Sequence, residues 1–151
     1  MENLNITLEQ LLIEIDSLIN EKISGTNYLE LLKSSLIEKI NNLKENDLKN
    51  FKIMPLDGKQ LEKEINLKNR KIQYRIEYFD KTVSKIKQRT KNDSLCLILK
   101  GIINITIYDI NNDTKSININ LLKNMGIVLS LNTVITSKIA EKSIILSISN
   151  N

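Results

Sequence analysis

The chain has 151 residues, 41% hydrophobic and 26% charged, which is typical of a globular protein and excludes a disordered one. Its net charge of +4 comes from lysines interleaved with acidic residues, as in Glu62-Lys63-Glu64, so it lacks the basic stripe with stacking aromatics of nucleic-acid-binding proteins. With no histidine and a single cysteine, Cys96, the composition excludes a histidine-based metal site, a cysteine–histidine catalytic pair and an intramolecular disulfide.

The first predicted element is an amphipathic helix. Thr7-Leu8-Glu9-Gln10 fits a capping box, in which the threonine hydroxyl accepts a hydrogen bond from a backbone N–H of the first turn. We expect the helix to end near Ser24-Gly25, because glycine adopts the left-handed cap conformation without strain. Asp16 is expected outside the apolar stripe. The stripe is formed by Leu8, Leu11, Leu12, Ile15, Leu18 and Ile19.

A second amphipathic helix is predicted from Thr26 or Asn27 to about Asn46-Asp47. Its apolar stripe is formed by Tyr28, Leu29, Leu32, Leu36, Ile40 and Leu43. The short connection favours an antiparallel helical hairpin. Two such helices cannot bury all their apolar surface against each other, so the rest covers the chain's own β domain, a second subunit or another protein. We expect a homodimer, which the second of these alternatives would produce.

The composition changes near the only proline, Pro55, which precedes the turn dipeptide Asp57-Gly58. We place a domain boundary here, with a helical hairpin and linker over residues 1–54 and a β domain over residues 55–151. No apolar run approaches the ~20 residues that cross a membrane as a helix, and no signal peptide is recognisable at the N-terminus. We therefore expect a cytoplasmic protein without a membrane partner.

The β domain is predicted to contain nine short strands, marked by β-branched residues, period-2 alternation and flanking turn residues. They cover residues 61–67, 71–79, 82–88, 95–100, 102–108, 115–122, 127–131, 134–139 and 143–148. The first strand is charged, as edge strands often are. Turn signals about every 8–12 residues are typical of an all-β sandwich or barrel.

This pattern resembles the cupins, which are small double-stranded β-helix (RmlC-like jelly-roll) proteins, over about Tyr74 to Ser149. Leu97-Ile98-Leu99-Lys100-Gly101 is similar to the turn that ends the first cupin motif, and residues 126–132 are similar to the opening of the second. The resemblance implies an α+β chain, in which an N-terminal helical hairpin precedes an all-β cupin-like jelly-roll barrel.

The metal chemistry of the cupins does not carry over to this sequence. The family's metal-ligand positions fall on Gln88 and Thr90 (or on Lys87 and Arg89), on Ser94 and near Ser137. Amide, hydroxyl and ammonium groups bind first-row metals poorly or not at all. We therefore expect neither a metal nor another cofactor.

Strand alternation predicts a small polar site inside the barrel. If Ile86 faces inward, then Gln88 and Thr90 do as well, and the opposite face carries the alternating basic residues from Lys85 to Lys91. The candidate ligand-binding residues are Gln88, Thr90, Ser94, Cys96 and Ser137. Such an uncharged lining suits a small neutral ligand. The alternative is a plain core whose few polar atoms bond to the backbone, in which Cys96 is a small buried hydrophobe.

Three functional hypotheses follow. The first is a metal-free, cupin-like binding or assembly module without catalysis of its own, and no catalytic residue is identified. The second is a small metabolic enzyme, similar to cupin-type sugar isomerases or epimerases; acidic pairs such as Glu77 and Asp80 are expected to face solvent. The third is a jelly-roll domain that senses a small molecule. An enzyme needs a solvent-connected pocket with converging ionisable groups, whereas a structural module exposes an apolar face on its helices.

Overall fold

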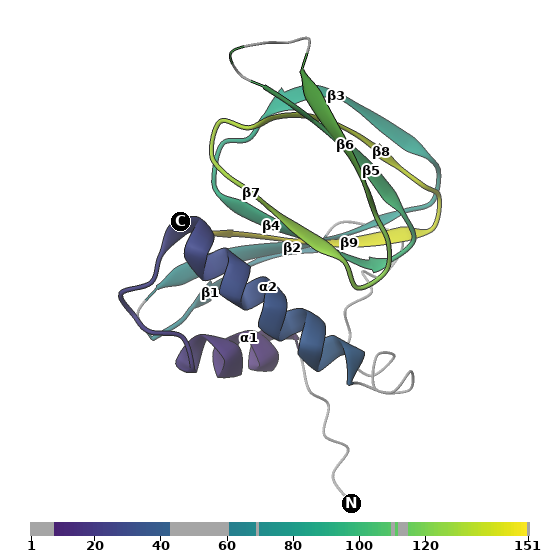
Figure 1. Ribbon diagram of the computed structural model, residues 1–151. Helices are drawn as coiled ribbons and strands as arrows, with labels where there is room; N and C mark the ends of the chain where they lie inside the picture. Colours follow the sequence, from purple (N-terminus) through teal and green to yellow (C-terminus); the bar gives the residue numbers. More distant parts are fainter. Residues whose placement is uncertain (1–7, 43–60, 69, 110, 112–114, 151) are drawn as a thin grey trace, which may run out of the picture.

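A computed structural model describes residues 8–42, 61–68, 70–109, 111 and 115–150. Within these residues, two helices precede nine strands (Figure 1). The helices are α1 (Leu8–Ser17) and α2 (Gly25–Asn41). The strands are β1 (Leu61–Asn66), β2 (Lys71–Phe79), β3 (Val83–Arg89), β4 (Ser94–Lys100), β5 (Ile103–Tyr108), β6 (Ser116–Leu121), β7 (Gly126–Leu129), β8 (Val134–Ile139) and β9 (Ser143–Asn150). All nine predicted strands are confirmed. The capping residue Thr7, Leu43 and the domain boundary at residues 54 and 55 lie outside the described ranges.

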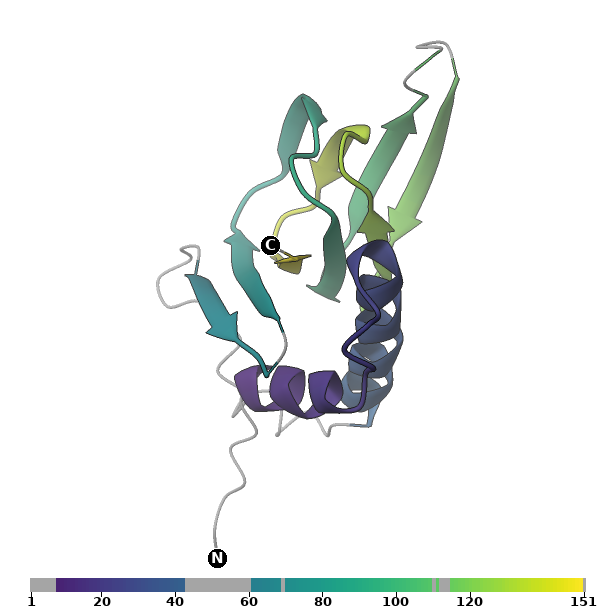
Figure 2. The same ribbon diagram turned by 90° about the vertical axis from the view of Figure 1, so that its left-hand side faces the viewer.

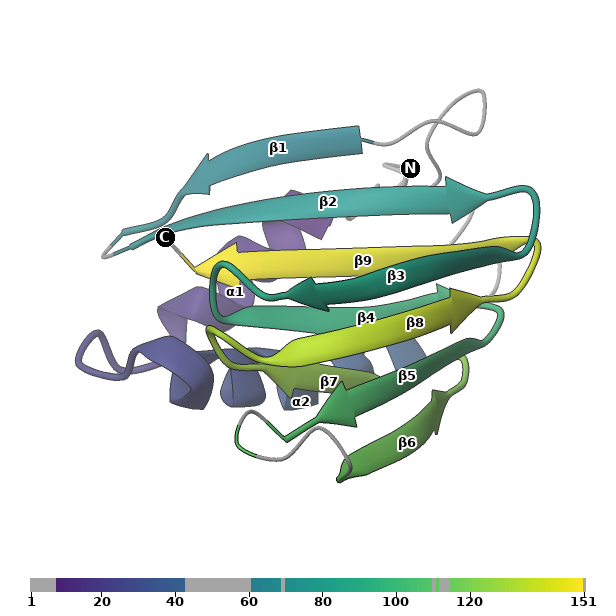
Figure 3. The ribbon, with the colours of Figure 1, turned by 90° about the horizontal axis from the view of Figure 1, so that it is seen from above.

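The strands form two antiparallel sheets that stack face to face (Figure 3). The five-stranded sheet has the order β1-β2-β9-β4-β7, and the four-stranded sheet has the order β3-β8-β5-β6. This arrangement confirms the predicted jelly roll. No ladder among the described strands joins the two sheets, so this jelly roll is a sandwich with open edges.

The helices cover the outer face of the five-stranded sheet, as Figures 1 and 2 show. The larger hydrophobic core lies between them, where Leu32 and Leu36 of α2 are buried together with Ile72 and Ile76 of β2. The helical stripes therefore pack on the chain's own β domain, which was the first of the three alternatives for them. The homodimer remains a prediction, but these faces are not available for its interface. Neither described helix is long and apolar enough to cross a membrane.

Two predictions about the first helix are wrong. The helix ends at Ser17, earlier than expected, so Leu18 leaves the stripe and is 80% exposed. Asp16, which was expected outside the apolar stripe, is buried with it. In addition, Figure 2 shows α1 and α2 crossing each other, which differs from the antiparallel hairpin that the short connection predicted.

Asp16 is buried because a polar cluster satisfies its carboxylate. The Arg70 Nε lies 3.0 Å from its Oδ1, and the Tyr28 hydroxyl donates to the same oxygen at 2.8 Å. The guanidinium carbon of Arg70 lies 3.8 Å from the centre of the Tyr28 ring, and its Nη1 donates to the Ile23 carbonyl. Burial, and then the hydrogen bond to Asp16, raise the pKa of Tyr28. The cluster links both helices to the turn between β1 and β2.

A second, smaller core lies between the two sheets. It contains Ile98, Ile103, Ile105, Leu121, Ile139 and Ile145. At one end of β4, the chain turns at Gly101, which has a φ of +90°, and passes close to the fully buried Ser143. The Ile102 N–H donates to the Ser143 hydroxyl at 3.2 Å. This turn leaves no room for a side chain at position 101.

Candidate ligand-binding cavity between the sheets

The five candidate residues meet in one cavity. Gln88, Thr90, Ser94, Cys96 and Ser137 all line a cavity of about 160 Å³ between the sheets. Ser94 and Cys96 come from the five-stranded sheet, and Gln88 and Ser137 come from the four-stranded sheet opposite. The structure therefore brings these five side chains together, although β3 does not alternate regularly between Lys85 and Gln88. That they bind a ligand remains a prediction.

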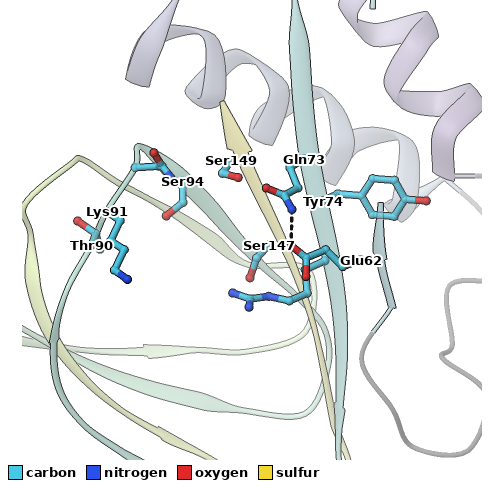
Figure 4. A pocket seen from close by; sticks show the side chains of 10 residues that line it. Glu62, Gln73, Tyr74, Thr90, Lys91, Ser94, Ser147 and Ser149 are labelled. Carbon is cyan, nitrogen blue, oxygen red and sulfur yellow. Dashed lines mark hydrogen bonds between the residues drawn. The ribbon is translucent and has the colours of Figure 1, made fainter. Parts of the chain in front are cut away.

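A wider groove joins this cavity at one end. It has a volume of about 310 Å³ and shares Arg75, Thr90, Ser94 and Ser147 with the cavity. The groove runs over the inner face of β1 and β2, which extend past the edge of the four-stranded sheet (Figure 3). In Figure 4, Gln73 donates a hydrogen bond to Glu62 on its wall, whereas the Tyr74 ring is directed away from it. The cavity is thus open to solvent.

Serine hydroxyls form much of the inner surface of the five-stranded sheet. Ser147 of β9 lies between Arg75 of β2 and Cys96 of β4, because it pairs with both, and Ser149 lies in the same way between Gln73 and Ser94. The sequence interpretation missed Ser147 and Ser149. Their alternation with buried isoleucines at the end of β9 is the signal that could have identified them.

The hydroxyl groups around the cavity differ in how they are satisfied. The Thr90 hydroxyl donates to the Ser130 carbonyl at 2.7 Å and accepts from the Thr133 N–H at 2.8 Å, so it holds two loops together at the rim. The hydroxyls of Ser94, Ser137 and Ser147 make no hydrogen bond within the described part of the chain. The plain-core alternative therefore describes Thr90 but not these three serines, which remain able to bind water or a ligand.

The expectation of an uncharged lining is wrong. Arg75, Glu77 and Lys85 also line the cavity. Arg75 and Glu77 form an ion pair, with 3.2 Å between Nε and Oε1. The Lys85 Nζ lies 5.6 Å from the centre of the Phe79 ring, and no carboxylate of the described residues lies within ion-pair distance of it. Charge is thus present inside the sandwich, where an uncharged polar lining was expected.

A β-bulge explains why Lys85 faces inward. Lys85 pairs with Ser137 and Gln88 pairs with Ile135, so β3 has one extra residue over this stretch. Lys85 and Gln88 therefore both face the cavity. Ile86, which regular alternation places inside, is 81% exposed and lines the cavity only at its solvent-facing margin.

Cys96 lacks the exposed surroundings of a nucleophilic cysteine. It packs against the core between the sheets. Burial raises the pKa of its thiol to about 12; Lys85 opposes this rise and Glu77 adds to it. The thiol is therefore protonated at neutral pH, when it is a poor nucleophile. This agrees with the expectation that Cys96 is a small hydrophobic residue.

The cavity does not fit the metal that cupins usually hold. The residues at the family's ligand positions, Gln88, Thr90, Ser94 and Ser137, present amide and hydroxyl groups. The carboxylate of Glu77 is paired with Arg75, and the Lys85 ammonium occupies the same cavity. The described residues contain no group of three or more histidine, cysteine, aspartate or glutamate side chains that could hold a metal ion. None of these groups supplies a free negative charge that could balance the charge of a metal cation.

No protein-family model and no curated protein matches the sequence. Among solved structures, a variant of oxalate decarboxylase from Bacillus subtilis matches with a TM-score of 0.50 and 10% identity, over 64% of this chain and 26% of that one. A cupin superfamily protein from Desulfitobacterium hafniense matches with a TM-score of 0.47 and 18% identity, over 64% and 82% of the two chains. The Drosophila melanogaster CENP-C cupin domain matches with a TM-score of 0.48 and 10% identity, over 72% and 100%. At these low sequence identities, the similarity shows only that the folds are alike. The chain contains a cupin-like jelly-roll domain.

Proposed function

We propose that this chain is a binding module that holds a small polar ligand between its two sheets, without catalysis of its own. The main support for this function is that one solvent-connected cavity is lined by the hydroxyls of Ser94, Ser137 and Ser147. None of these hydroxyls has a hydrogen-bond partner within the described residues. Binding sites of this kind combine apolar walls with a few well-placed polar groups. Here Ile103, Ile135 and Ile145 are among the apolar lining residues.

The helices support binding over assembly. An assembly module of the kind considered above uses the apolar faces of its helices. The apolar residues of these faces from Leu8 to Ile15 and from Tyr28 to Ile40 are instead buried against the chain's own sheet. The cavity is also small, at about 160 Å³, so its ligand has few heavy atoms inside the sandwich and extends, if larger, into the groove of about 310 Å³.

A cavity-filling substitution tests this function. The melting temperature would be measured with and without each of four compounds: glucose, sorbitol, gluconate and phosphate. At least one compound should raise the melting temperature of the wild type in a concentration-dependent way. Ser137→Leu should remove that rise, because the larger side chain occupies the cavity. Thr136→Leu is the matched control, because Thr136 is the neighbour of Ser137 on β8 and faces the outer side of the same sheet. An equal rise in wild type and Ser137→Leu would contradict the proposed site.

Catalysis in the same cavity is a second candidate function. Glu77 and Lys85 both line the cavity, carry opposite charges and are not paired with each other among the described contacts. Converging ionisable groups are what an acid–base enzyme requires. The solved cupins that resemble this chain include oxalate decarboxylase, but a likeness of fold does not choose between binding and catalysis. Proton NMR of any bound compound, followed over a day, separates the two: a binding module leaves it unchanged, and an enzyme converts it.

A further inference from the structure

The charge inside the cavity is not balanced. Among the described residues, Arg75 and Lys85 are the two cations that line it, and Glu77 is the single carboxylate. Because Glu77 is paired with Arg75, the remaining positive charge belongs to Lys85. Bringing an ammonium group into a partly enclosed space costs free energy unless a compensating group lies near it. The Phe79 ring, 5.6 Å away, offsets only a small part of that cost at this distance.

Lys85 also lies beside the free hydroxyl groups. It pairs directly with Ser137 across β3 and β8, which brings their side chains next to each other on the inner face. Burial raises the pKa of Cys96 on the facing sheet, and the positive charge of Lys85 partly offsets that rise. The electrostatic effect of the ammonium group therefore extends across the cavity. Cys96 in turn pairs with Ser147. One cation is therefore bordered by hydroxyl groups from both sheets.

We propose that the ligand of this cavity is a small hydroxylated monocarboxylate, whose carboxylate pairs with Lys85 and whose hydroxyl groups bond to Ser94, Ser137 and Ser147. This inference rests on the proposed function, since it names the class of ligand that the cavity takes. A single unbalanced positive charge selects an anion with one negative charge. A carboxylate also makes a charge-assisted hydrogen bond with an ammonium group, which is stronger than a bond between neutral partners.

The test uses two compounds that differ at one terminal carbon, which carries the charge in only one of them. Gluconate and sorbitol share their carbon skeleton and hydroxyl pattern, but a carboxylate in the first replaces a terminal CH2OH in the second. Isothermal titration calorimetry on the full chain would measure binding of both to the wild type, to Lys85→Gln and to Lys138→Gln. Lys138 is the matched control, because it is an exposed lysine of the same sheet that does not line the cavity.

The expected result is that gluconate binds the wild type and Lys138→Gln alike, and binds Lys85→Gln roughly tenfold or more weakly. Binding should weaken with added salt, because the ion pair is only partly enclosed. If sorbitol binds as well as gluconate, or if Lys85→Gln leaves gluconate binding unchanged, the inference is overturned while the binding function stands. If neither compound binds and no compound raises the melting temperature of the wild type, both are overturned. Circular dichroism of Lys85→Gln distinguishes lost binding from lost folding.

Discussion

Lys85 and Lys87 are two residues apart in β3, yet they lie on opposite faces of the four-stranded sheet. Lys85 lines the cavity, whereas the Lys87 Nζ lies 4.3 Å from the centre of the Tyr108 ring, on the outer face where Tyr108 contacts Thr136. In a regular strand, residues two apart share a face. The bulge between Lys85 and Gln88 is therefore the feature that gives the cavity its charge.

The bulge predicts that Ile86 contributes little to stability. Ile86→Ala should change the free energy of unfolding by less than about 0.5 kcal/mol, because the side chain is 81% exposed. Ile98→Ala, in the core between the sheets, should cost about 2–5 kcal/mol. Urea denaturation of both variants measures the difference. Equal losses would mean that Ile86 is buried and that β3 alternates regularly.

The turn at Gly101 predicts a position where no side chain is tolerated. A Cβ at Gly101 would lie 2.7 Å from the Ser143 Cα, and the residue has a φ of +90°. Gly25 also has a positive φ, of +61°, but the nearest atom to its added Cβ is 3.6 Å away. Gly25→Ala should therefore cost only the conformational penalty of about 1–2 kcal/mol, and Gly101→Ala clearly more. Thermal melts of the two variants compare them; similar melting temperatures would show that the turn relaxes without cost.

The buried pair of Asp16 and Arg70 predicts a strong dependence of stability on both partners. Asp16→Asn or Arg70→Met should destabilise the protein by about 3–5 kcal/mol, because each leaves the other charge buried without its partner. Glu30→Gln removes the exposed ion pair with Lys33 on α2 and should cost less than about 0.5 kcal/mol. Chemical denaturation checks all three variants. A small loss in the first two would mean that water reaches the cluster.

Burial of Cys96 predicts a loss of stability at high pH. The pKa of the thiol is about 12 in the folded chain, above the ordinary value of 9.0, so the folded state retains a proton that the unfolded state releases. This contribution is therefore complete below pH 9 and falls as the pH rises toward 12, by at most about 1.4 kcal/mol per pH unit. Between pH 8 and 10.5, Cys96→Ala should lose less stability than the wild type in urea denaturation. Parallel curves for the two proteins would indicate an exposed thiol.

Much of the fold could be predicted because strand alternation is a local property. In β6, Ile117, Ile119 and Leu121 alternate with Ser116, Asn118 and Asn120, and the structure places these two sets on opposite faces. The asparagines bond to Asn104 on the outer face, as expected for polar residues. A pattern that repeats every two residues can be recognised in a short segment without knowing how the rest of the chain folds.

The remaining features depend on contacts that local patterns do not contain. In β2, alternation correctly separates Ile72, Tyr74 and Ile76 from Arg75 and Glu77, but it does not tell which layer covers each face. The helices cover the apolar face, so the charged face turns into the sandwich. Asp16 is buried by Arg70, which lies far along the chain, and the bulge in β3 has no glycine to mark it.

The most direct test of the central claim, that the space between the sheets is a ligand site, is an NMR titration of the 15N-labelled chain with gluconate. Amide shifts should concentrate on Gln88, Ser94, Ser137 and Ser147, which line the cavity from both sheets. Amides of the outer face, such as Asn104 and Asn118, should not move. Shifts confined to the outer face or the helices would contradict the account, whereas a spectrum that gluconate leaves unchanged would overturn the choice of a monocarboxylate as the ligand.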